Sequence, residues 1–129
     1  MTTPPLPPGE GALGEAVIPR PDNNFPALRA ALARVAPTRL PELIAERATV
    51  FTMATRSSSY QPIALYQLKW ATVIEIERFP ALARRLRAAE HAARSLDRDD
   101  AAWRTAMDEI RAITDAARRA VLSPSGLCG

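Results

Sequence analysis

Helical periodicity is the feature that most constrains how this chain can fold. From residue 24 to residue 122, apolar side chains recur every three or four positions, which is the spacing of one face of an α-helix. No stretch of this region alternates apolar and polar residues for long, as a half-buried strand would. The full chain has 129 residues, about the length of one domain. The pattern therefore predicts an all-α fold, a compact bundle of about five helices.

Short proline-containing or polar links separate the expected helices. Pro26 and Pro80, each in a copy of the sequence FPAL, suit the first turn of a helix, where a missing N–H costs nothing. Before the last segment, Asp97, Asp99 and Asp100 are candidate N-caps. The expected helices cover residues 25–35, 40–55, 61–78, 80–96 and 101–122.

The third of these helices is expected to be the central one, because it is apolar over most of its circumference. Trp70 is expected in the core, and Phe79 at the corner that follows. The arc of this helix expected to face solvent comprises Ala64, Gln67, Ala71, Glu75 and Arg78. On the second helix the expected buried stripe comprises Leu40, Leu43, Ile44, Val50, Phe51 and Ala54. Met53 of this helix and Met107 of the last helix are expected to be further core residues.

The two ends of the chain differ in composition from this helical region. Residues 1–23 contain six prolines and three glycines with few large apolar groups, so burial cannot offset the entropy lost on ordering. We expect a flexible tail over 1–23, one helical domain over 24–122 and a flexible C-terminal tail over 123–129. The PPLPP stretch could dock as polyproline II in an aromatic groove, but such tails are more often solvated.

Residues able to support catalysis or metal binding are scarce. His91 is the only histidine, Cys128 is the only cysteine and lies next to the C-terminus, and all five glycines lie in the tails, which leaves no phosphate-binding loop. Glu75 and Glu77 point about 200° apart on a helix, so they cannot act together as acid and base. We therefore expect no catalytic residue, no cofactor and no metal.

The expected location of the protein is the cytoplasm. A single cysteine near the chain end excludes an internal disulfide, which suits a reducing compartment. The N-terminus lacks the pattern of a signal peptide, and no apolar run approaches the ~20 residues that span a bilayer. We expect no membrane association.

A row of basic residues on the fourth expected helix is the strongest binding candidate. It lies opposite the apolar stripe of that helix and consists of Arg84, Arg87, His91, Arg94 and Arg98, here named the Arg ridge. Trp103 nearby is of the residue type enriched at interface hot spots. With a net charge of only +3, a non-catalytic partner-binding regulator is the favoured function, and a nucleic-acid-binding regulator using the Arg ridge is the alternative. A merely solvated arginine face also fits the pattern, because 16 of the 17 Lys and Arg residues are arginine.

A sequence resemblance adds to this interpretation. Several stretches of the chain resemble a family of short, uncharacterised actinomycete proteins defined only as a domain of unknown function. The matching residues are Trp70, the Ile76–Arg78 run, Pro80, the Leu82–Glu90 run and the RVAPTRLPEL stretch of Arg34–Leu43. The resemblance covers roughly residues 25 to 120, and Phe79 departs from it because that position is more often polar in the family. It implies a small helical accessory protein, antitoxin-like in that some relatives look like partners in toxin–antitoxin-type gene pairs. It implies no catalytic residues.

Overall fold

A computed structural model describes residues 14–123 of the chain. These residues form five α-helices and one 3-10 turn, with no strand among them, so the all-α prediction is confirmed. The helix bounds agree closely with those expected from the sequence. The elements are α2 (Phe25–Val35), η1 (Pro37–Arg39), α3 (Leu40–Ser57), α4 (Gln61–Glu77), α5 (Pro80–Ser95) and α6 (Ala101–Leu122).

Local sequence explains where the helices begin and end. Proline occupies the first turn of α2, α3, α4 and α5, where its fixed φ favours the helix and its missing N–H has no helical acceptor. The Asn24 side chain accepts a hydrogen bond from the Ala27 N–H at 2.9 Å, and Asp100 caps α6 in the same way. Ser58 ends α3 in the left-handed conformation, with φ of 53°.

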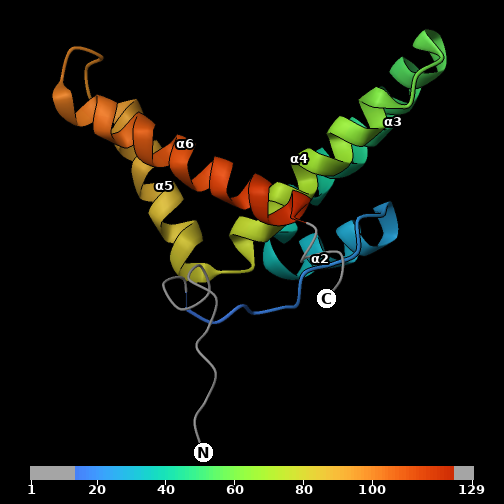
Figure 1. Ribbon diagram of the computed structural model, residues 1–129, viewed down its shortest axis with the longest axis horizontal. Helices are drawn as coiled ribbons and strands as arrows, with labels where there is room; N and C mark the ends of the chain where they lie inside the picture. Colours follow the sequence, from blue (N-terminus) through green and yellow to red (C-terminus); the bar gives the residue numbers. More distant parts are fainter. Residues whose placement is uncertain (1–13, 124–129) are drawn as a thin grey trace, which may run out of the picture.

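The helices form two hairpins that diverge like the arms of a V (Figure 1). One arm pairs α3 with α4 and the other pairs α5 with α6. The C-terminal part of α6 crosses α4 where the arms meet, and α2 packs against α3 and α4 at the base (Figure 1). Because α4 contacts α2, α3, α5 and α6, it is the central helix expected from its apolar circumference.

Two clusters of buried side chains hold the arms together. The larger surrounds Trp70, which is fully buried, as are Leu28, Leu32, Leu43 and Ile74. The second cluster lies at the corner between α4 and α5, and its members are Ile76, Phe79, Leu82, Ala83, Ile113 and Ala117. The predictions that Trp70 belongs to the core and that Phe79 is buried at the corner are thus confirmed.

Residues 14–23 correct part of the expected N-terminal tail, because they pack on the helical domain. The Val17 N–H donates to the carbonyl oxygen of Arg78 at 2.8 Å, and Ile18 is buried in the larger core cluster. Composition averages over a whole segment, whereas one buried isoleucine and a few hydrogen bonds are enough to anchor this part of it. The tails expected over residues 1–13 and 124–129 lie outside the described residues.

Several side chains of α3 and α4 differ in burial from what the sequence predicted. Ile44, Phe51 and Met53 of α3 are 45%, 43% and 51% exposed rather than buried. Phe51 and Met53 lie in the C-terminal half of α3, toward the free end of an arm that extends beyond the other helices (Figure 1). On α4, the reverse holds: Glu75 and Arg78 are buried, although the sequence placed them on a solvent-facing arc. Amphipathic patterning cannot say how many neighbours a helix has.

Candidate functional site

The Arg ridge lies on the outward face of the α5–α6 arm. Leu82, Ala83 and Ala89 form the buried side of α5. Four of the five ridge residues, Arg84, Arg87, His91 and Arg94, lie on α5 and are all exposed. Arg98 is also exposed, in the turn that leads to α6. The placement follows from helix periodicity, since these positions recur at three- and four-residue spacing opposite the packed side.

The ridge residues differ in what they contact. Arg87 is held by an ion pair with Glu77, with 2.8 Å between the guanidinium and the carboxylate. The Arg98 guanidinium lies 6.0 Å from the centre of the Trp103 ring, and Trp103 is half-buried. The side chains of Arg84, His91 and Arg94 make no hydrogen bond or ion pair with any residue of the described part of the chain, although the backbone carbonyl of His91 accepts from the Ser95 hydroxyl at 2.8 Å. The ridge therefore offers three cationic or ionisable groups that are not engaged within that part.

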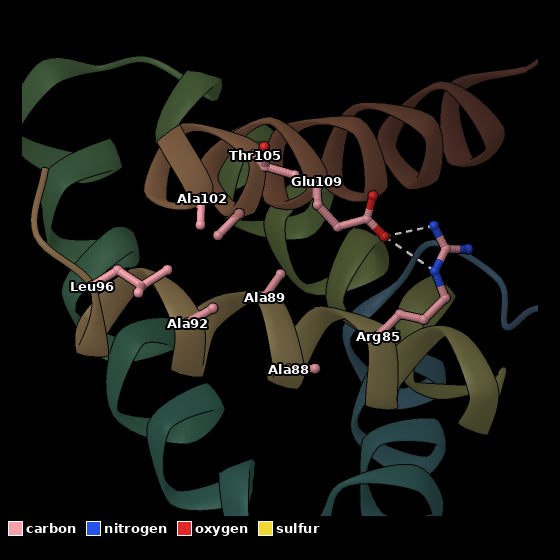
Figure 2. Close-up of a pocket in the computed structure, with 9 residues that line it drawn as sticks. Arg85, Ala88, Ala89, Ala92, Leu96, Ala102, Thr105 and Glu109 are labelled. Atoms are coloured by element: carbon pink, nitrogen blue, oxygen red, sulfur yellow. Dashed lines mark hydrogen bonds and ion pairs between the residues drawn. The ribbon is translucent and has the colours of Figure 1, made fainter. Parts of the chain in front are cut away.

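An alanine-lined pocket of about 430 Å³ lies between α5 and α6 (Figure 2). Its walls include Ala88, Ala89 and Ala92, and at one end the Arg85 guanidinium donates to Glu109 Oε1 at 2.6 Å. The Thr105 hydroxyl donates to the carbonyl of Ala101 at 3.3 Å, so it is already satisfied. The pocket is thus apolar with one internally neutralised ion pair, an arrangement that fits apolar contact rather than proton transfer.

A second hollow lies where the two arms meet. This groove has a volume of about 500 Å³ and is lined by both hairpins. Leu65 and Leu68 of α4 and Leu86 of α5 supply apolar lining, and Glu90 of α5 supplies a carboxylate. Leu65 is 57% exposed. We refer to this hollow as the junction groove.

A buried ionic cluster joins the N-terminal segment to α4. The Glu75 carboxylate accepts from Arg20 Nε and from Arg78 Nε, each at 2.9 Å, and Arg78 Nη1 donates to the carbonyl of Ile18 at 3.1 Å. Burial by itself raises the pKa of Glu75, but the hydrogen bonds and positive charges of Arg20 and Arg78 outweigh it, and the pKa is lowered below its ordinary value of 4.5. The cluster links the N-terminal segment to α4 through paired charges, so it holds the segment against the helical domain.

The lowered pKa of Glu75 predicts a specific dependence of stability on pH. A carboxylate whose pKa is lower in the folded chain stabilises the fold fully above its unfolded pKa, and this contribution is lost as pH falls through the folded pKa. The free energy of unfolding of the native chain should therefore exceed that of Glu75→Gln by a constant amount near neutral pH. The difference should shrink below about pH 4.5, in urea titrations at several pH values. A difference that stays constant down to about pH 3, roughly 1.5 units below the ordinary pKa of a glutamate, would contradict a lowered pKa for Glu75.

Comparisons with known protein families, curated proteins and solved structures found no match to this chain. Within residues 14–123, no group of three or more His, Cys, Asp and Glu side chains is placed to hold a metal ion. Over the same residues, no helix is long and apolar enough to cross a bilayer. The geometry of the described surface is therefore the basis for any functional proposal.

The structure adds two features to those expected from the sequence. It shows the Arg20–Glu75–Arg78 cluster, for which the only sequence signal was a Glu and an Arg three residues apart on a helix that is otherwise apolar on nearly all sides. It also shows the junction groove, which is lined by residues of both arms. The groove could not be predicted from the sequence, because it depends on the angle at which the two arms meet (Figure 1).

Proposed function

We propose that this chain is a non-catalytic, partner-binding protein that docks an acidic surface of another protein on the Arg ridge. The observation that carries the proposal is the exposure of Arg84, His91 and Arg94 without a partner among the described residues. Arg98 and Trp103, stacked at the end of the ridge, are of the two residue types most enriched at binding hot spots. If the resemblance to gene-pair accessories holds, the product of an adjacent gene is the first partner to test.

Reversing two ridge charges tests this proposal. Arg84→Glu with Arg94→Glu should weaken capture of the partner by about tenfold or more, because like charges then face an acidic surface. Both side chains are exposed, so the helical circular dichroism should not change. The measurement is affinity purification of the tagged chain from nuclease-treated host extract, followed by titration of the purified partner.

A matched control is available on α2. Arg29 and Arg34 are exposed and make no hydrogen bond or ion pair with the described residues, but they lie away from the ridge. The double variant Arg29→Glu with Arg34→Glu makes the same change in net charge and should leave binding intact. Equal loss in both double variants would mean that net charge, rather than the ridge, controls association.

Nucleic acid is the second candidate partner, favoured by the exposed arginines of the Arg ridge. Phosphate contacts by Arg84, Arg94 and Arg98 would make log affinity fall with log salt with a slope of about −3 on a duplex. Asp97, Asp99 and Asp100 adjoin the end of the ridge and oppose a phosphate backbone there, although Asp100 already caps α6. Fluorescence polarisation with a labelled DNA duplex distinguishes the two, since an affinity that is absent or flat with salt eliminates this candidate.

A further inference from the structure

We infer that the junction groove is a self-association site that receives the α3–α4 arm of a second copy of this chain. This surface is separate from the Arg ridge, so the inference goes beyond the proposed function and does not depend on it. The groove presents Leu65, Leu68 and Leu86 to solvent at the meeting point of the arms. Exposed apolar surface of this kind, bordered by polar groups, is typical of protein interaction sites.

The apolar surface continues from the groove toward the tip of the α3–α4 arm. The Lys69–Glu46 ion pair, at 2.7 Å, joins α4 to α3 on the side of the arm that faces the groove. Leu65 lies four residues before Lys69, and Met53 lies seven residues after Glu46, so both lie on this same side. They are 57% and 51% exposed. Leu65 and Met53 therefore place exposed apolar surface between the groove and the arm tip, and we call this surface the strip.

Two unengaged opposite charges lie at the two ends of this strip. Glu90 lines the groove, is half-buried, and makes no hydrogen bond or ion pair with any residue from 14 to 123. Arg56 lies one helical turn beyond Met53 near the arm tip, is exposed, and likewise has no such partner in this part of the chain. Covering Glu90 with apolar surface would be costly unless a cation pairs with it. Arg39, Lys69 and Arg118 also line the groove, but each is already paired with a carboxylate. An apolar occupant that brings a further positive charge would therefore balance Glu90.

A second copy satisfies these requirements when the two α4 helices lie antiparallel about a two-fold axis. When the axis passes midway between Leu65 and Leu68, residues equally far from that point in the two copies lie opposite each other. Tyr60 of one copy then lies opposite Val73 of the other, and Val73 lines the groove. The arm tip of each copy then lies along the groove of the other, which places Arg56 of one copy near Glu90 of the other, twice. Such a contact is self-complementary, as two-fold interfaces are. Each groove is completed by a residue from the other copy.

Sedimentation equilibrium of the full chain tests the inference. From micromolar to millimolar concentration, the chain should form a reversible dimer of twice its 14.0 kDa mass. Leu65→Glu should weaken the dimer by about tenfold or more, because it places one buried carboxylate from each copy close to the two-fold axis. Leu122→Glu is the matched control, since Leu122 is 59% exposed but lies outside the groove, and it should leave the dimer unchanged.

A charge exchange tests the pairing of the two copies. Arg56→Glu and Glu90→Arg should each weaken the dimer, and the double variant should restore most of the affinity, because it rebuilds the pair with reversed polarity. A chain that is monomeric over the whole range, a dimer that Leu65→Glu leaves intact, or a double variant that binds no better than the single ones would overturn the inference. None of these results bears on partner capture by the Arg ridge, so the two proposals can fail separately.

Discussion

Replacing Glu75 with alanine is expected to lower the free energy of unfolding by about 3–5 kcal/mol, because it leaves a buried arginine without its anion. The Arg78 side chain is 7% exposed and that of Glu75 is 6% exposed, so the guanidinium left behind would have little access to solvent. The Arg78 guanidinium would keep its hydrogen bond to the carbonyl of Ile18 and its contact with the Phe79 ring, but no anion. Chemical denaturation followed by circular dichroism at neutral pH measures the loss.

Two comparison variants make this result specific to the buried cluster. Glu46→Ala removes a carboxylate from the exposed pair with Lys69, and the expected loss is below about 1 kcal/mol. Arg20→Ala should cost less than Glu75→Ala, since the Arg20 side chain is 32% exposed and Arg78 would still balance the carboxylate. If Glu75→Ala proved no more harmful than Glu46→Ala, the cluster would not be the anchor of the N-terminal segment.

Replacing Trp70 with alanine should cost about 3–5 kcal/mol, a loss comparable with that of Glu75→Ala, because it empties the centre of the larger core cluster. Trp70 is fully buried, and Arg39 and Lys69 cover its ring at 4.9 Å and 5.0 Å from the centroid. The variant should still be helical at low temperature but unfold at a lower denaturant concentration. The measurement is urea denaturation in which the loss of helix is followed by circular dichroism, analysed as a two-state transition.

The phenylalanine variant separates packing from hydrogen bonding at this position. The indole Nε1 of Trp70 is buried and has no hydrogen-bond partner among the described residues. Trp70→Phe therefore removes ring volume and an unsatisfied donor, but it breaks no hydrogen bond. We expect it to cost about 1–2 kcal/mol, well below the alanine variant. Equal losses in the two variants would mean that the indole group makes a contact that ring packing does not explain.

The helices could be predicted from the sequence because their determinants are local. Proline in the first turn, Asp100 as an N-cap and apolar residues at three- and four-residue spacing act within one or two turns of the chain. The exposed position of the Arg ridge follows from the same periodicity. Its expected role in binding stays a prediction, since local spacing says which side of α5 faces outward but nothing about what docks there.

The environment of each side chain on α3 and α4 could not be predicted in this way. Helical periodicity assigned Phe51 to a buried stripe and Glu75 to a solvent-facing arc, and the structure reverses both. Phe51 lies on the outer part of an arm that has no further helix packed on it there, whereas Glu75 meets a segment that is distant in sequence. A hydrophobic pattern describes one helix, and burial depends on all the helices around it.

The sequence by itself determined the helices, their limits and the outward face of α5, because each depends on interactions between residues three or four positions apart. Tertiary structure alone decided that the two hairpins diverge, that their meeting point leaves a groove, and that Arg20 pairs with Glu75 across 55 positions of the chain. The physical reason is that packing between distant segments depends on the shape and burial of whole surfaces. No local pattern encodes those surfaces.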